Sequence, residues 1–101
     1  MTLSELGSLL ETTGYPVAYR SFSTTKTPPF ICYLVAYSNN FSADGKVFAK
    51  ADHIQVELYT DKKDQVAEAK VESALSGFFW QKTEIYLQSE AIYQIIYEIE
   101  V

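Results

Sequence analysis

The chain of 101 residues contains few of the residue types that build catalytic and metal sites. Its single cysteine cannot form an internal disulfide, and one cysteine with one histidine cannot make a structural zinc site. Four scattered glycines provide neither a phosphate loop nor a dinucleotide-binding fingerprint. No apolar run approaches the roughly 18 residues of a membrane-spanning helix. We therefore expect no metal, no cofactor and no contact with a membrane.

Basic residues are also scarce. The eight lysines and arginines are dispersed and are outnumbered by thirteen acidic residues, which gives a net charge of −5. Proteins that bind nucleic acid present clustered positive charge to the phosphates, so specific binding to DNA or RNA is not expected. Residues 1–10 include Glu5 and lack the basic start and apolar core of a signal peptide, which predicts a protein made in the cytoplasm and not exported.

Apolar and aromatic residues, in contrast, are plentiful. They make up 48% of the chain and include eight tyrosines, six phenylalanines and one tryptophan. This is enough bulk for one modest core, so we expect a single domain over residues 1–101. The tyrosines have two interpretations: tyrosine is enriched where proteins meet, and it also favours strands on the outer face of a sheet.

Hydrophobic periodicity predicts the elements of the first half of the chain. Leucines at helical spacing predict a helix over residues 3–13, with Thr2 or Ser4 as its N-cap and Gly14 left-handed at its end. We then expect strands at 17–19, 30–37 and 46–59, a mobile surface loop without apolar anchors at 21–29, and a turn at 38–44 that leads into the hairpin dipeptide Asp44-Gly45.

The second half begins with a predicted helix that Asp61 caps and Gly77 ends. The helix dipole disfavours Lys62 and Lys63 in its first turn, which hints that these lysines serve something other than helix stability. The expected apolar stripe comprises Val66, Ala67, Val71, Ala74 and Leu75, with Glu68, Lys70 and Glu72 on the solvent side.

Two further strands, 80–87 and 92–101, are close enough in sequence to form a hairpin. Strict alternation in residues 53–59 and 92–101 indicates one face toward the core and one toward water or a partner. The resulting order is α-β-β-β-α-β-β. We therefore predict an α+β fold: a mainly antiparallel, mixed sheet of four to five strands with two helices packed on one face.

Nucleophilic catalysis has little support in this pattern. Cys32 lies inside an apolar strand and is expected to be a small buried side chain, and His53 has no evident fixed partner. The two residues need not share a face of the sheet. We therefore predict that the protein is not an enzyme and has no catalytic residues.

Several segments together resemble a known group of proteins. They are residues 14–19 (GYPVAY), 28–34 (PPFICYL), 38–47 (SNNFSADGKV) and 56–64 (VELYTDKKD), with Ser89-Glu90, Tyr93 and Tyr97-Glu98 near the end. This series resembles small structural proteins encoded by long-tailed phages and prophages of Gram-positive bacteria, among the head-tail joining and tail terminator genes. None of the segments is a catalytic signature.

The resemblance implies an α/β subunit of the virion neck or tail. Such a protein assembles with itself into a ring, commonly a hexamer, at the end of the tail tube, and contacts the tail tube protein on one side and the head-completion or connector protein on the other. DNA passes through such a ring without being gripped, which agrees with the negative net charge.

The residues that we expect to help make these contacts are Asn39, Asn40, Phe41, Asp44, Lys62 and Lys63. A turn shaped only by its own Asn and Asp side chains would explain the first four equally well. The alternative function is a small intracellular adaptor domain of prophage origin that binds one protein partner through an exposed sheet edge.

Overall fold

The computed structural model describes residues 1–43 and 46–101, and for residues 39–43 and 46–50 it describes the backbone alone. The elements in chain order are α1 (Leu3–Glu11), β1 (Val17–Tyr19), β2 (Phe30–Ala43), β3 (Lys46–Thr60), α2 (Gln65–Ala74), β4 (Gln81–Leu87) and β5 (Ile92–Glu100). The predicted α+β fold and its order α-β-β-β-α-β-β are confirmed.

The strands form one mixed five-stranded sheet in the order β1-β2-β3-β5-β4. The short β1 pairs in parallel with β2, with Val17 opposite Ile31, and every other pairing is antiparallel. β3 and β5 pair from Thr60 opposite Tyr93 to His53 opposite Glu100. The sheet therefore has β1 at one edge and β4 at the other.

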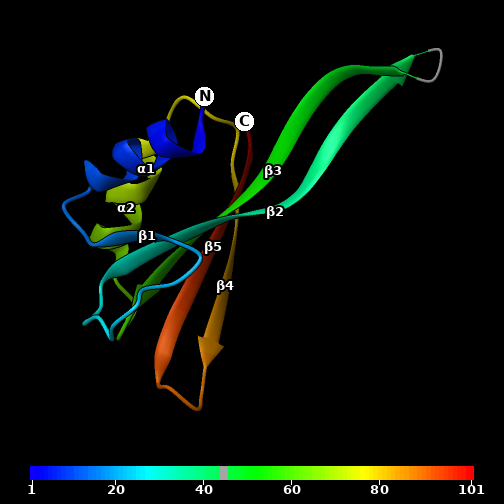
Figure 1. Ribbon diagram of the computed structural model, residues 1–101. Coiled ribbons are helices and arrows are strands. Elements are labelled where there is room, and N and C mark those ends of the chain that lie inside the picture. The colour runs from blue at the N-terminus through cyan, green and yellow to red at the C-terminus, as the bar shows by residue number, and fades with distance from the viewer. Residues whose placement is uncertain (44–45) are drawn as a thin grey trace.

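Both helices cover the same face of the sheet (Figure 1). Side chains that alternate along the three inner strands meet the apolar stripes of α1 and α2 there, as the alternation predicts. The buried core comprises Leu6, Leu10, Ile31, Tyr33, Ile54, Val56, Leu58, Ala67, Val71, Leu75, Ile95, Tyr97 and Ile99. The opposite, helix-free face carries the other alternating set of side chains.

The ends of α1 follow the predicted local rules. Thr2 and Glu5 form a capping box, in which the Glu5 N–H donates to Thr2 Oγ1 over 3.1 Å and the Thr2 N–H donates to Glu5 Oε1 over 2.9 Å. These hydrogen bonds hold the pKa of Glu5 below its usual value. Gly14 has a φ of 86°, the left-handed conformation that glycine accepts without steric cost.

α2 differs from its prediction at both ends. Its N-cap is Asp64, whose side chain accepts from the Ala67 N–H over 3.0 Å, and not Asp61. The helix ends at Ala74, and Gly77 has no positive φ. Starting three residues later keeps two lysines out of the first turn, where the helix dipole would oppose them. Val66, predicted in the apolar stripe, is 67% exposed.

The β2–β3 hairpin is longer than predicted. The expected turn is wrong over residues 38–43, which continue β2 and pair with β3 from Asp52 to Lys46. The predicted hairpin dipeptide Asp44-Gly45 lies outside the described residues. Hydrogen bonding between the two strands outweighs the turn preference of the Asn and Ser residues. Register shifts occur between Val35 and Tyr37 and between Phe41 and Ser42. Residues 39–43 and 46–51 are called the hairpin arm below.

Candidate interaction site

The hairpin arm extends beyond the rest of the sheet (Figure 1). β5 and the following Val101 are hydrogen-bonded to β3 only as far as Asp52, and β1 pairs with β2 only as far as Tyr33. In the described part of the arm no third strand is hydrogen-bonded to either side, so both edges are open. The molecule is consequently elongated, 49 × 27 × 26 Å. A two-stranded ribbon is marginal in water alone, and open edges invite pairing with another chain.

The base of the arm is held by ring stacking and by contacts of His53 with two glutamates. The rings of Tyr37 and His53 are stacked with centroids 4.5 Å apart and planes 7° from parallel. His53 Nε2 lies 3.0 Å from Glu98 Oε1, and Nδ1 lies 3.8 Å from Glu100 Oε1. The expectation that His53 has no fixed partner is therefore wrong, because the register of β5 against β3 brings two glutamates to it.

Cys32 and His53 lie on the same helix-free face but do not form a pair. Cys32 is opposite Glu57, which is four residues along β3 from His53, a separation of about 13 Å. Cys32 is 4% exposed, and burial together with the Glu57 charge raises the pKa of its thiol. The prediction of a small buried side chain is confirmed, and both effects named for this thiol raise its pKa, the opposite of what nucleophilic catalysis needs.

An aromatic cluster lies at the other end of the hairpin, on the helix-free face. Phe30 and Tyr59 are cross-strand partners with stacked rings 4.9 Å apart, and Phe22 packs edge-on against Phe30 at 5.6 Å. The expectation that loop 21–29 lacks an apolar anchor is wrong, because Phe22 is half-buried against this cluster. The side chains of Phe22, Phe30, Tyr59, Leu87 and Ile92 are called the aromatic end below.

Two hollows lie on either side of the Phe30–Tyr59 pair, and both rings line each of them. One, of about 310 Å³, is lined also by Arg20, Ser21, Phe22, Thr24, Thr25, Lys26 and Cys32. The other, of about 280 Å³, is lined also by Leu87, Glu90 and Ile92. Volumes of this size are at the lower limit for ligand pockets, which suits a side chain of a partner better than a drug-sized molecule.

Hydrogen bonds fix the orientation of Tyr59 at this end. Its hydroxyl donates to Glu57 Oε1 over 3.0 Å and accepts from Gln94 Nε2 over 3.0 Å. Burial, followed by the Glu57 charge, raises the pKa of Tyr59 well above its ordinary value. The ring between the two hollows is therefore rigid and neutral at physiological pH.

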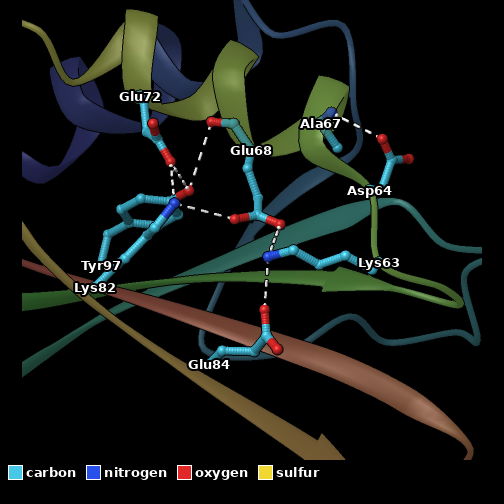
Figure 2. A network of polar contacts seen from close by, with 8 residues as sticks. All are labelled: Lys63, Asp64, Ala67, Glu68, Glu72, Lys82, Glu84 and Tyr97. Carbon is cyan, nitrogen blue, oxygen red and sulfur yellow. Dashed lines mark hydrogen bonds and ion pairs between the residues drawn. The ribbon is translucent and has the colours of Figure 1, made fainter.

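A polar network joins α2 to the edge strand β4 (Figure 2). Glu68 is 4% exposed and lies 2.7 Å from Lys63 Nζ and 3.1 Å from Lys82 Nζ. Its predicted place on the solvent side of the helix is wrong, since β4 lies beneath that side. Two more carboxylates complete the network: Lys82 pairs with Glu72 at 2.8 Å, and Lys63 pairs with Glu84 at 2.6 Å.

The network shifts the pKa values of Lys63 and Glu72. Hydrogen bonds to Glu68 and Glu84 raise the pKa of Lys63 to about 12. Burial alone would raise the pKa of Glu72, but hydrogen bonds from Lys82 and from the Tyr97 hydroxyl, 2.7 Å away, lower it overall. Lys63 and Glu72 are therefore charged across the physiological range, and their ion pairs with Glu84 and Lys82 hold β4 against the helix layer.

The sequence-predicted contact residues are spread over two places. Asn39, Asn40 and Phe41 are in the β2 strand of the hairpin arm, and Asp44 lies outside the described residues. Lys62 is exposed before α2, whereas Lys63 is engaged in the polar network. The structure therefore does not bring the five described residues of this set into one cluster, and the binding of the six to a partner stays a prediction.

His53, Glu98 and Glu100 also line a hollow of about 300 Å³, together with Phe79, Gln81 and Ile99. Among the described residues no group of three or more His, Cys, Asp or Glu side chains could hold a metal ion. No helix in the described ranges is long and apolar enough to cross a membrane. The two candidate interaction surfaces are the hairpin arm at one end of the molecule and the aromatic end at the other.

A solved structure described as the virion of a native gene transfer agent particle contains a similar chain. The similarity covers 95% of this chain and 83% of that one, with a TM-score of 0.61 and 10% sequence identity. The two chains share a fold. No protein-family model matches the sequence, and the comparison with curated proteins found no match.

Proposed function

We propose that this protein is a non-enzymatic virion assembly protein, a tail terminator or head-tail joining component that forms a ring at the end of a phage tail tube. The observation that carries the proposal is the hairpin arm, a paired ribbon that leaves the sheet and has open edges within its described residues. In a monomer the arm leaves strand edges exposed to water, whereas in an assembly it can contact a neighbouring subunit.

Two other observations support the proposal. The chain has the fold of a chain in a gene transfer agent virion, and its sequence resembles the tail completion proteins of long-tailed phages. The described residues also place the one histidine and the one cysteine apart, each in a setting that favours structure over catalysis. These observations favour a role in assembly over a role in catalysis.

In this function the subunit contacts a second copy of itself, the tail tube protein and the head connector. We propose that Asn39, Asn40 and Phe41 make contacts through the hairpin arm, that Asp44, next to the arm in sequence, takes part, and that Lys62 contributes from the opposite end of the hairpin. Lys63 contributes through its side chain, which is 44% exposed although its amino group is paired with Glu68 and Glu84. The ring would be located in the virion neck, with DNA passing through it.

The test compares self-association of three forms of the chain by sedimentation velocity. The variant Phe41→Glu places a charge on the hairpin arm, and the control Val66→Glu places the same charge on an apolar side chain that is 67% exposed on α2. We expect Phe41→Glu to reduce association at least tenfold and Val66→Glu to leave it unchanged, with both variants folded by circular dichroism. Equal effects of the two variants would refute the role of the arm.

If the chain does not associate with itself at any concentration, the adaptor function becomes the better account. That function predicts a monomer that binds one host protein.

A further inference from the structure

We propose that His53 is a pH-dependent switch at the base of the hairpin arm. When its ring takes up a proton at Nδ1, it donates a second hydrogen bond to β5, through Glu100, and fixes the arm against the end of that strand. When the ring is neutral this hydrogen bond is absent and the junction is looser. The inference goes beyond the proposed function and does not depend on it, since every group involved belongs to one copy of the chain.

His53 lies where the hairpin leaves the sheet. Its cross-strand partner is Tyr37, whose ring stacks on the imidazole, and a register shift precedes Tyr37 in β2. One residue nearer the arm, the backbones of Asp52 and Val101 exchange two hydrogen bonds of 3.0 Å. Beyond this point the described part of the sheet continues only as the two strands of the arm (Figure 1). A contact made by His53 therefore acts at the junction between arm and sheet.

The contacts of the ring define which nitrogen carries the proton in its neutral form. A neutral imidazole has one N–H donor and one acceptor nitrogen, whereas an ionised carboxylate only accepts. Nε2 of His53 lies 3.0 Å from Glu98 Oε1, so Nε2 is the donor and Nδ1 carries the lone pair. Nδ1 is buried and has no hydrogen-bond partner within the described part of the structure. It lies 3.8 Å from Glu100 Oε1, so that two acceptors face each other.

A proton taken from water onto Nδ1 turns this unfavourable pairing into a favourable one. The ring is then positively charged and donates from both nitrogens, to Glu98 and to Glu100. Hydrogen bonds between charged partners are the stronger ones in proteins. A separation of 3.8 Å is too long for a hydrogen bond, so the Glu100 side chain, which is 49% exposed, has to turn slightly toward the ring. A carboxylate accepts at two oxygens, which makes this contact compatible with others that Glu100 makes.

The groups around the ring come from three neighbouring elements. β5 provides the two glutamates and β2 the stacked Tyr37 ring. Asp52, the next residue along β3, is directed to the opposite face and accepts from the Ser38 hydroxyl over 2.8 Å. The hollow beside the ring is lined also by the uncharged side chains of Phe79, Gln81 and Ile99. Histidine ordinarily changes its charge between pH 5 and 8. The second hydrogen bond is therefore present at the acidic end of this range and absent at the alkaline end.

The experiment follows amide hydrogen exchange of the full chain by NMR at pH 5.5 and pH 7.5. Exchange rates are converted to protection factors, which removes the intrinsic effect of pH on exchange. The reporters are the amides of Asp52 and Val101, whose hydrogen bonds join the end of β5 to the base of the arm. Three variants are compared with the parent chain: Glu100→Gln, His53→Phe, and the control Glu11→Gln at the exposed end of α1.

We expect the protection of both amides to be about fivefold or more higher at pH 5.5 than at pH 7.5, in the parent chain and in Glu11→Gln. In Glu100→Gln the difference should fall below about twofold, because a Gln amide donates to the neutral ring and accepts from the protonated one. In His53→Phe, which keeps a ring to stack on Tyr37, the pH dependence should also be lost. A parent chain without the difference, or both variants with the full difference, would overturn the switch.

The ring itself provides a second measurement, since the chain has a single histidine and thus one set of imidazole ¹⁵N signals. These signals should show the proton on Nε2 at pH 7.5 and protons on both nitrogens at pH 5.5. A neutral ring with its proton on Nδ1, or a ring still neutral at pH 5.5, would overturn the inference. Neither measurement requires self-association, so a failure of the switch and a failure of the proposed ring are distinguishable.

Discussion

Removing the buried charge of Glu68 should loosen the edge strand β4 more than it disturbs the rest of the sheet. Glu68 is 4% exposed and lies between two ammonium groups, at 2.7 Å from Lys63 and 3.1 Å from Lys82. The substitution Glu68→Gln keeps the size and shape of the side chain but removes the charge that both lysines face.

The expected cost follows from the exposure of the three groups. Removing one partner of a fully buried ion pair costs about 3–5 kcal/mol. The side chains of Lys63 and Lys82 are 44% and 40% exposed, so water compensates part of their lost partner. They also retain Glu84 and Glu72. We therefore expect Glu68→Gln to lower the free energy of unfolding by about 2 kcal/mol, which is less than the fully buried value.

The assay is urea unfolding followed by tryptophan fluorescence, since urea, unlike guanidinium chloride, does not screen ion pairs. For a domain of this size a loss of 2 kcal/mol corresponds to a decrease in Tm of about 8–16 °C. Hydrogen exchange should show faster exchange in β4 and in the part of β5 that pairs with Lys82 and Glu84, from Ile95 to Tyr97, with little change in β2. The matched control is Glu11→Gln, on the exposed end of α1, which should change stability by less than about 0.5 kcal/mol.

The reasoning fails if Glu68→Gln costs no more than the control, or if exchange accelerates equally in every strand. The first result would mean that water already compensates the network. The second would mean that β4 does not depend on it.

Two further predictions concern the backbone and pH. Arg20 has a φ of 67° and Ala91 a φ of 51°, left-handed backbone conformations that cost a residue with a side chain about 1 kcal/mol or more. The substitutions Arg20→Gly and Ala91→Gly should therefore each raise the urea concentration at the midpoint of unfolding slightly. A clear decrease of the midpoint for either variant would show that the contacts of its side chain outweigh the backbone strain. Lys82 and Tyr97 lower the pKa of Glu72 below its unfolded value of 4.5, so its contribution is present above that pH and is lost as pH falls through the folded pKa. The stability difference between Glu72→Gln and the parent chain should therefore be largest near pH 7 and shrink as the pH falls below 4.5, and a difference that does not depend on pH would contradict this.

The sequence predicted the elements that depend on local chemistry. Periodic leucines, the Thr2 cap and the left-handed Gly14 define α1, and strict alternation places Ile54, Val56 and Leu58 in the core. These signals come from neighbours in sequence, so they can be read without knowing the fold. The order of elements followed from them.

Other features depended on partners far along the chain. Glu68 was predicted at the surface because nothing in the helix itself shows that β4 will lie beneath it. Asn39 and Asn40 favour turns, yet strand pairing carries β2 through them. The aromatic end was missed because its parts come from a loop, two strands and the β4–β5 hairpin. The signal that could have revealed it was Phe22, the single large apolar residue in an otherwise polar loop.

The measurement that tests the proposed ring most directly is the absolute mass of the unmodified chain in solution, by light scattering from micromolar to millimolar concentration. The chain itself has a mass of 11.5 kDa. A ring predicts a mass that rises with concentration to a plateau at a fixed multiple, near six subunits for the hexamer that the resemblance implies. A constant 11.5 kDa over the whole range would contradict self-assembly of the free chain.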